Sequence, residues 1–439
     1  MTATEPTTAG PTTAGPTTAK PTRRAVLGGA LGGVVTGMSG TVTGCSRAPR
    51  AVQVAVVWSG TELARFRNVV RGYPHPVDVV STRNDIDAFL GTRYRTANQP
   101  DVAIVPQIGL ITDYARRGWL AAVPPEITRR FAAGWNDMLT VDGVQYGAWV
   151  KAAHKSLVWY SPDTLAEPPP PTWDEFVALV RRLAAAGHPA PLAVGAADGW
   201  VLTDWLENLL IGVTTEAEYQ GLVDGSVHWD SAPVRTALTH LAEVWAIPGA
   251  FPDGRARALI TQQEESVIQV SERRAAMVVE GDFVAAVADK FRPAGAAALA
   301  AERFPAMSGI HPLLVAGDAA VVFDGSSAGH DLVEWLTGSA PFQPWIDSGG
   351  YLSPNLRIPA EAYGAGPAAR LADELRSATG TLRFDLSDQL RGSLGGPDGL
   401  GIWKILQDFF AEVSRPGAVD RACRRLVRAA AQARREAGS

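Results

Sequence analysis

The stretch Val144–Leu183, VQYGAWVKAAHKSLVWYSPDTLAEPPPPTWDEFVALVRRL, decides the fold of this chain. Its first half, up to Tyr160, is rich in Val, Trp and Tyr and has neither Gly nor Pro after Gly147, which predicts an extended segment. Its second half predicts a helix, because Thr172 and Glu175 have the spacing of a capping box. The apolar residues that then recur on one helical face are Phe176, Leu179, Val180 and Leu183.

A stiff connector separates these two halves. Pro168 to Pro171 favours an extended, rigid spacer. A long strand, a rigid spacer and a new helix are suited to carrying the chain out of one lobe and into another. The length of 439 residues agrees with this, because it is too long for one ordinary hydrophobic core and suits two lobes.

Strands and helices alternate on the N-terminal side of this stretch. Apolar runs of strand length cover Val52–Trp58, Val77–Val80 and Asp101–Val105, and a helical pattern follows each. This alternation predicts a parallel α/β sheet, in which ligands gather at the loops after the carboxyl ends of the strands. The residues carried by those loops are Trp58, Glu62, Arg83 and Gln107.

Further candidate residues follow the stretch. Trp200, Asp204 and Trp205 lie on a turn and the first turn of a predicted helix. A strand is predicted over Ala275–Glu280, and Gly281-Asp282-Phe283 opens the next helix. Each aromatic or charged side chain at such a position either contacts a ligand, packs against its own helix or strand, or is simply exposed to solvent.

Composition describes a soluble globular protein, with 46% hydrophobic and 19% charged residues. The formal net charge of −5 offers no general electrostatic attraction for nucleic acid. Thirteen Trp residues are many, and most are expected to pack the core, but exposed indoles in a cleft would stack on sugar rings.

Residues 1–44 predict a disordered Pro-Thr-Ala-Gly repeat followed by an export signal. Arg23 and Arg24 precede a Gly-rich apolar run and resemble a twin-arginine signal. The sequence Val-Thr-Gly-Cys ending at Cys45 resembles a bacterial lipobox, which implies that Cys45 is lipidated and becomes the mature N-terminus. An ordinary cleaved signal, or a cysteine that occurs there by chance, is the alternative. We therefore expect a lipid-anchored, monomeric protein on the extracellular face of the bacterial cytoplasmic membrane.

Motifs of catalysis are weak or incomplete. Gly325-Ser326-Ser327-Ala328-Gly329 matches a hydrolase nucleophile elbow, but the last His is His330, and no HGGG motif is present, so a turn with a helix N-cap is favoured. The Gly-rich segment Gly392–Gly401 lacks the ending of a phosphate-binding loop and predicts a flexible loop. No HExxH or Cys/His spacing occurs, so we expect neither a metal site nor a cofactor, and no enzyme activity.

Four segments in order resemble the carbohydrate-type solute-binding proteins (family 1) of bacterial ABC importers. Tyr146–Leu165 followed by Pro170–Leu183 resembles the first crossover of that family, His311–Phe323 the return crossover, and Trp345–Asn355 the third connecting segment. RFDLSDQLRGSLGGPDGLGIWKILQDFF, from Arg383 on, resembles the closing stretch of the alpha-glucoside-type subset. The resemblance extends over most of the chain from about Val52.

The resemblance implies an α/β, two-lobed, type II periplasmic-binding-protein-like fold with crossing segments and a central cleft. The expected domains are residues 45–150 with 316–352 for lobe 1, and 151–315 with 353–439 for lobe 2. It also implies a function, in which a sugar or oligosaccharide is captured by hinge closure and delivered to ABC permease subunits. The candidate ligand-binding residues are Trp58, Glu62, Arg83, Gln107, Lys151, His154, Trp200, Asp204, Trp205, Asp282, Phe283, Asp318, Tyr351, Arg383, Asp385 and Trp403.

Two positions depart from the family pattern. Asp282-Phe283 and the segment around Asp318 fall where many sugar binders present an indole, so a more polar or charged solute stays an alternative to a sugar. Two other functions also stay open. One is a secreted glycosidase with two carboxylates, and the other is a sensor or adhesion lipoprotein that keeps the same fold.

Overall fold

The computed structural model describes residues 50–187, 189–364, 367–377, 382–395 and 401–437, and the structural statements below concern this part of the chain. The predicted repeat and signal in residues 1–44, the lipidation site Cys45 and part of the Gly-rich segment Gly392–Gly401 lie outside the described residues.

A six-stranded sheet is the centre of what we call the first lobe. Its order is β12-β11-β3-β1-β2, and β6 also pairs with β11. β1 is parallel to both β2 and β3, whereas β11 is antiparallel to β3 and β6. The strands are β1 Val52–Val56, β2 Val77–Ser81, β3 Val102–Val105, β6 Ala148–His154, β11 Leu313–Val322 and β12 Leu382–Phe384.

Short helices surround this sheet. They are α1 Gly60–Val70, η1 Arg83–Asp85, α2 Ile86–Arg95, α3 Ile108–Arg116, α4 Pro125–Thr128, α5 Ala133–Asp137, α13 Ser327–Leu336, α14 Gln343–Asp347, η2 Ala360–Tyr363 and α15 Pro367–Ser377. A two-stranded ladder, β4 Thr140–Val141 with β5 Val144–Gln145, precedes β6. The strand and helix alternation predicted for residues 52–117 is confirmed.

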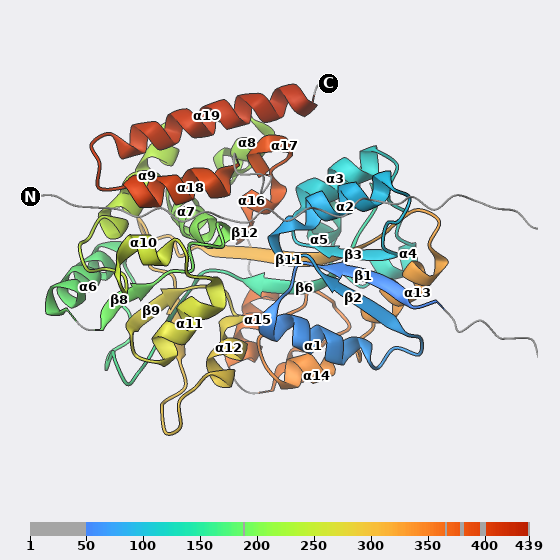
Figure 1. Ribbon diagram of the computed structural model, residues 1–439, viewed down its shortest axis with the longest axis horizontal. Helices are drawn as coiled ribbons and strands as arrows, with labels where there is room; N and C mark the ends of the chain where they lie inside the picture. The colour runs from blue at the N-terminus through green and yellow to red at the C-terminus, as the bar shows by residue number, and fades with distance from the viewer. Residues whose placement is uncertain (1–49, 188, 365–366, 378–381, 396–400, 438–439) are drawn as a thin grey trace, which may run out of the picture. The chain divides into compact units, whose positions relative to one another are not determined.

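A four-stranded sheet is the centre of what we call the second lobe, in the order β10-β7-β9-β8. Its strands are β7 Leu157–Tyr160, β8 Ala190–Ala193, β9 Ala275–Val279 and β10 Ala300–Arg303. The helices that we group with this sheet are α6 Trp173–Ala186, α7 Trp200–Val213, α8 Glu216–Asp224, α9 Ala232–Trp245, α10 Gly254–Ala258, α11 Gln263–Ser271, α12 Val284–Lys290, α16 Leu386–Gln389, α17 Gly392–Gly395, α18 Ile402–Glu412 and α19 Ala418–Ala437. The C-terminal helices α18 and α19 lie beside α7 and α9 (Figure 1).

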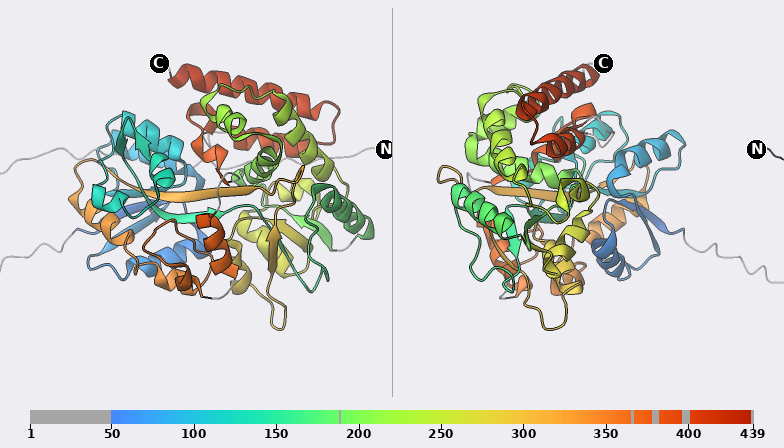
Figure 2. Two further views of the ribbon diagram at one scale, coloured as in Figure 1. Left: turned by 180° about the vertical axis from the view of Figure 1, so that it is seen from behind. Right: turned by 60° about the vertical axis from the view of Figure 1, so that its left-hand side comes forward.

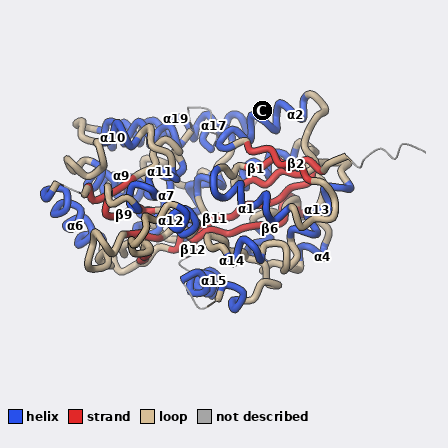
Figure 3. The backbone as a smooth tube through the Cα atoms, turned by 60° about the horizontal axis from the view of Figure 1, so that its bottom comes forward, coloured by secondary structure: helices blue, strands red, loops and turns tan. Residues whose placement is uncertain are grey.

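The strands β6 and β11 run from one lobe into the other. Figure 1 shows the long β11 with elements of the first lobe at one end and elements of the second lobe at the other, and the view from behind in Figure 2 shows the same crossing. Figure 3 shows β1 and β2 on one side and β9 on the other, with β6 and β11 between them. The buried apolar side chains form two large clusters, and the first of them contains residues of both lobes, such as Val54 of β1 and Val278 of β9. The two-lobed α/β fold is thereby observed, and the domain limits given above stay a prediction.

The stretch Val144–Leu183 forms the elements predicted for it. Its extended half becomes β5, β6 and β7, with a break at Lys155-Ser156, and its second half becomes α6, which ends at Gly187 with φ of 94°. The predicted capping box is wrong in detail, because the Thr172 hydroxyl donates to the Glu175 carboxylate at 2.5 Å and caps no backbone N–H. Both members of a capping box are instead present at Thr215 and Glu218 of α8.

Ser326 confirms the interpretation of the hydrolase-like motif as a helix start. It is the N-cap of α13, and its hydroxyl accepts a hydrogen bond from the backbone N–H of Gly329 at 3.0 Å. Cys423 is buried and carries a free thiol. Within the described ranges, every helix is too short or too polar to cross a lipid bilayer.

Candidate ligand-binding site

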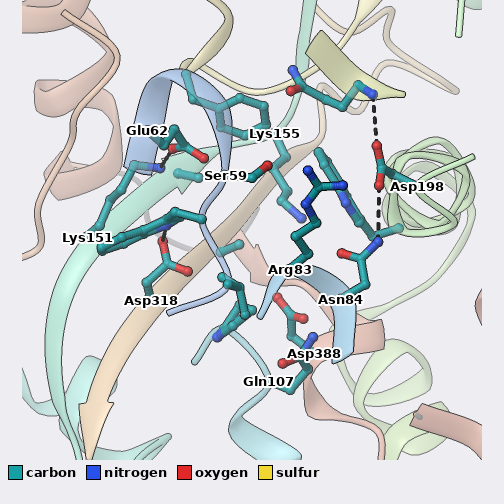
Figure 4. Close-up of a pocket in the computed structure, with 18 of the residues that line it drawn as sticks. Ser59, Glu62, Arg83, Asn84, Gln107, Lys151, Lys155, Asp198, Asp318 and Asp388 are labelled. Atoms are coloured by element: carbon teal, nitrogen blue, oxygen red, sulfur yellow. Dashed lines mark hydrogen bonds and ion pairs between the residues drawn. The ribbon is translucent and has the colours of Figure 1, made fainter. Parts of the chain in front are cut away.

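A cavity of about 200 Å³ lies where the carboxyl ends of β1, β2 and β3 meet the first turns of α7 and α11 (Figure 4). Its polar lining residues are Ser59, Glu62, Arg83, Asn84, Gln107, Lys151, Lys155, Asp198, Gln262, Gln263, Glu264, Asp318 and Asp388. Its aromatic lining residues are Trp58, Trp200, Phe283 and Trp403. Because both lobes contribute, the cavity lies between them.

Lys151 is at the centre of one charged group on the cavity wall. Its ammonium lies 3.2 Å from a carboxylate oxygen of Glu62 and 5.3 Å from the centre of the Phe283 ring. Asp318 lies opposite Lys151 on the neighbouring strand β11 and accepts a hydrogen bond from the indole N–H of Trp58 at 3.1 Å. Figure 4 shows Glu62, Lys151 and Asp318 together on one side of the cavity.

Burial and charge set the protonation of this group. Burial acts to lower the pKa of Lys151, but the carboxylates of Glu62, Asp318 and Asp282 outweigh it, so the pKa lies above its usual value. Burial raises the pKa of Asp318 to about 6, although the Lys151 charge opposes that shift. Lys151 is therefore cationic at neutral pH, and the pKa of Asp318 lies just below neutral pH.

Lys155 is at the centre of a second charged group, just past the end of β6. Its ammonium lies 3.0 Å from a carboxylate oxygen of Asp204 and 2.6 Å from one of Asp385. It also lies 5.2 Å from the centre of the Trp200 ring. Asp385 is held in turn, because its other oxygen accepts from the Ser387 hydroxyl and from the backbone N–H of Asp388. Lys155 therefore lies in a network that fixes its position.

The carboxyls of this second group differ in their pKa values. Burial raises the pKa of Asp204 to about 7, despite its contact with Lys155. Burial acts in the same direction on Asp385, but Lys155 and the hydrogen bonds to Asp385 outweigh it and lower its pKa. Burial together with the neighbouring Asp385 raises the pKa of Asp388 well above its usual value. Asp388, which lines the cavity, therefore holds its proton more strongly than an ordinary Asp does.

The aromatic residues of the cavity are packed rather than loose. Trp403 is mostly buried, and a Cβ placed on Gly199 would lie 2.6 Å from the Trp403 Cβ atom. Glycine at position 199 therefore allows the start of α7 to approach Trp403 closely. Trp200, on the first turn of α7, contacts Phe283 edge-on at 6.0 Å between ring centres.

Arg83 has an unusual backbone. Its φ is 54°, in the left-handed region that side chains other than glycine rarely adopt. Among the described residues, no hydrogen-bond acceptor or carboxylate partners its guanidinium, and Figure 4 shows the side chain extending into the cavity. Strained residues of this kind cluster at functional sites.

The structure brings many of the predicted candidates together. Those that line the cavity are Trp58, Glu62, Arg83, Gln107, Lys151, Trp200, Phe283, Asp318 and Trp403. Two others, Asp204 and Asp385, lie directly behind it as partners of Lys155. Their contact with a ligand stays a prediction.

The remaining candidates lie away from the cavity. His154 is fully buried, with its Nε2 atom 3.6 Å from Glu374, and burial lowers its pKa to about 4. Asp282 accepts a hydrogen bond from the backbone N–H of His154 at 2.8 Å. Trp205 is fully buried in the second lobe, and the Tyr351 hydroxyl donates to the Val150 carbonyl at 2.6 Å.

Arg383 pairs with Glu216 at 3.7 Å, outside the cavity lining. Several residues that do line the cavity were missed by the sequence reasoning. They are Ser59, Asn84, Lys155, Asp198, Gln262, Gln263, Glu264 and Asp388. Lys155 and Asn84 each lie next to or near a predicted residue, so the strand-end rule could have included them. Gln262 to Glu264 start a helix that no sequence motif marks.

A second cavity, of about 410 Å³, lies near β10 and α15. Its polar lining residues are Glu302, Arg303, Arg370, Asp373 and Glu374. No aromatic residue lines it, and none of the predicted candidates does. The described residues contain no cluster of His, Cys, Asp and Glu with the geometry of a metal site.

The family model for bacterial extracellular solute-binding proteins matches residues 91–341, more than half of the chain. The chain belongs to this family. Curated relatives of this solute-binding protein include the osmoprotective compounds-binding protein GgtB of Synechocystis sp., 29% identical over 367 residues that cover 79% of this chain and 86% of GgtB. The alpha-glucosides-binding periplasmic protein AglE of Rhizobium meliloti is 27% identical over 379 residues, 80% of this chain and 81% of AglE.

Solved structures show the same fold for the solute-binding protein. RafE in complex with raffinose superposes with a TM-score of 0.70 at 16% identity, covering 86% of this chain and 100% of that one. A chitin oligosaccharide binding protein gives a TM-score of 0.72 at 16% identity, covering 88% and 98%. The type II, two-lobed periplasmic-binding fold is confirmed by these likenesses.

Proposed function

We propose that this solute-binding protein captures a sugar or oligosaccharide in the cavity between its lobes and delivers it to the permease of an ABC importer. The observation that carries the proposal is the lining of the cavity, in which indoles and hydrogen-bonding side chains from both lobes surround one space. One relative described as binding alpha-glucosides, and a structural neighbour with raffinose, support a saccharide as ligand.

The chemistry of the lining suits a polyhydroxylated ring. Trp200 and Trp403 offer apolar faces for the C–H side of a sugar. Glu62 and Asp318 offer carboxylate oxygens that accept from hydroxyl groups, and Arg83 offers guanidinium donors. Donors and acceptors occur together, so a neutral polyol can satisfy both.

Hinge closure is the mechanism that we propose for capture. An open form would expose the cavity, and a ligand that touches both lobes at once would favour the closed form, because it binds that form more tightly than the open one. The crossing strands β6 and β11 are suited to be the hinge, because both continue from the first lobe into the second. No covalent chemistry is needed.

We also propose that Cys45 is lipidated and retains the protein on the membrane, with Val42-Thr43-Gly44-Cys45 as the supporting observation. Two acyl chains give stable anchoring where one gives only marginal binding. Cys45→Ala should release the protein to the medium or leave an unprocessed precursor. Unchanged membrane fractionation and unchanged mass would contradict the anchor.

A thermal-shift screen with monosaccharides, methyl glycosides and oligosaccharides tests the binding function. A ligand that binds only the folded form at a hundredfold excess over Kd adds about 2.7 kcal/mol of stability. That corresponds to a rise in Tm of a few degrees for lobes of this size. A panel that gives no shift would remove saccharide binding as the function, and release of chromophore from chromogenic glycosides would favour a glycosidase instead.

A further inference from the structure

One side of the cavity is closed by a hydrogen bond between the two lobes. The amide Nδ2 of Asn84, from η1 of the first lobe, donates to Oδ1 of Asp198, before α7 of the second lobe, at 3.1 Å. The other carboxylate oxygen of Asp198 accepts from the backbone N–H of Gln263 at 2.9 Å. Figure 4 shows Asp198 and Asn84 joined on the side of the cavity opposite Glu62, Lys151 and Asp318.

A second bridge between the lobes stands next to the first. Oε1 of Glu264, on the first turn of α11, accepts from the backbone N–H of Thr61 at the start of α1, at 2.8 Å. The N-cap residue of α1, Ser59, makes no side-chain capping bond, so Glu264 from the opposite lobe takes that role. Gly60 allows this approach, because a Cβ there would lie 2.5 Å from the Glu264 carboxylate oxygens.

The two bridges use consecutive residues of one helix start. The backbone N–H of Gln263 donates to the Asp198 carboxylate, and the Glu264 carboxylate accepts from the backbone N–H of Thr61 in α1. The side chains of Asn84, Asp198 and Glu264 line the cavity. The charged group around Lys151 lies opposite the Asn84–Asp198 bridge (Figure 4), whereas the second bridge ends at Thr61, next to Glu62 of that group. The space between has a volume of about 200 Å³, below the roughly 300–1,000 Å³ typical of sites that enclose a drug-sized ligand.

We propose that the bridges Asn84–Asp198 and Thr61–Glu264 limit the length of the ligand, so that the closed protein takes one sugar ring, free or with a small substituent, and excludes trisaccharides. This inference rests on the proposed function and adds a size class to it. A longer saccharide that extended past either bridge would have to displace it, and a broken bridge would leave unpaired the polar groups that it satisfies in this conformation.

Calorimetric titration can test the limit with two sets of probes. The short set contains D-glucose, D-galactose and their methyl glycosides, and the long set contains maltotriose and raffinose. We expect the tightest short probe to bind at least tenfold more tightly than either trisaccharide. A trisaccharide that binds as tightly as the best short probe would overturn the size limit and leave saccharide binding intact. Absence of binding by both sets would overturn the proposed function and the limit with it.

The double variant Asn84→Ala/Glu264→Ala removes both bridges. Its ratio of short-probe to trisaccharide affinity should fall by at least fivefold, because the closed side becomes open. Asp113→Ala is the matched control, since Arg391 of the second lobe donates to Asp113 of the first at 2.7 Å, outside the cavity lining. If this affinity ratio fell as much in the control, or did not fall in the double variant, the bridges would not be what limits the length of the ligand.

Discussion

Two lysines only four residues apart on the same crossing segment are used differently. Lys151 and Lys155 are both buried, and each lies over an aromatic ring and beside carboxylates. Lys151 has one close partner, Glu62, whose side chain remains 26% exposed. Lys155 has two, Asp204 and Asp385, whose side chains are almost completely buried.

The difference between them follows from the backbone. Lys151 lies within β6 and faces the cavity wall beside Asp318 of the paired strand β11. Lys155 lies at the break between β6 and β7, where the start of α7 and the start of α16 converge on it. A charge with exposed partners can exchange them for ligand hydroxyls, whereas one locked between buried carboxylates stabilises the fold. We therefore propose that Lys151 contacts the ligand and that Lys155 mainly stabilises the fold.

Removing Lys155 should give the largest effect. Lys155→Ala leaves the buried carboxylates of Asp204 and Asp385 without their cation, so the free energy of unfolding should fall by about 3–5 kcal/mol. Chemical denaturation measures this. The control Lys404→Ala removes a half-exposed pair with Asp408 and should cost less than about 1 kcal/mol. Equal losses for the two variants would contradict a structural role for Lys155.

Trp200→Ala should affect binding more than folding. Loss of the indole face that we assign to the sugar should weaken saccharide affinity by about 1–3 kcal/mol, measured by calorimetric titration. Arg383→Ala is the control, because Arg383 pairs with Glu216 outside the cavity lining and should leave affinity unchanged. If Arg383→Ala weakened binding as much as Trp200→Ala, the cavity would be the wrong site.

Lys151→Met should separate the two lysines most clearly. Its close partner Glu62 can turn toward water, so the loss of stability should be about 1–2 kcal/mol, smaller than for Lys155→Ala. Saccharide affinity should fall in Lys151→Met as well. Chemical denaturation and calorimetric titration of the same preparation give the free energy of unfolding and the saccharide affinity. A stability loss as large as that of Lys155→Ala, together with unchanged affinity, would mean that Lys151 stabilises the fold and does not contact the ligand.

The smallest change that we expect is in the pH dependence of stability. This dependence should distinguish the charged group around Lys151 from the one around Lys155. Asp318 has a pKa of about 6 and Asp204 of about 7 in the folded protein, both above the value of about 3.9 for an unfolded Asp. The folded state thus binds these protons more tightly, and their contribution to stability is complete below about pH 4 and lost as the pH rises.

Variants resolve that loss into two parts. Asp318→Asn should flatten the fall in stability between about pH 4 and pH 6, and Asp204→Asn should flatten it up to about pH 7, relative to the unmodified protein. Denaturation midpoints across this range provide the measurement. A slope that neither substitution changes would mean that these carboxyls titrate as ordinary exposed groups.

Much of the fold could be predicted because local patterns and tertiary structure agree. The alternation of apolar strands and helices around Val52–Trp58 reports a sheet whose strand ends carry the cavity residues. At Thr172 the hydroxyl donates to the Glu175 carboxylate but its oxygen accepts from no backbone N–H, whereas Thr215 makes both bonds with Glu218. Sequence spacing fixes which groups are near each other and not which of several bonds forms.

The site was predictable only in part, for a related reason. Trp58, Arg83 and Gln107 follow strands of one sheet, so a rule about strand ends finds them. Asp198 and Glu264 reach the cavity only because the second lobe brings α11 against α1, and no local pattern encodes that meeting. His154 alternates with cavity residues along the crossing segment, yet it is buried against Glu374.

A crystal structure with the tightest saccharide from the thermal-shift screen would locate the ligand. We expect the sugar between the two lobes, with its ring against Trp200 or Trp403 and its hydroxyl groups on Glu62, Asp318 or Arg83. A saccharide seated outside this cavity, for example beside Arg303 and Glu374 in the second cavity, would contradict it.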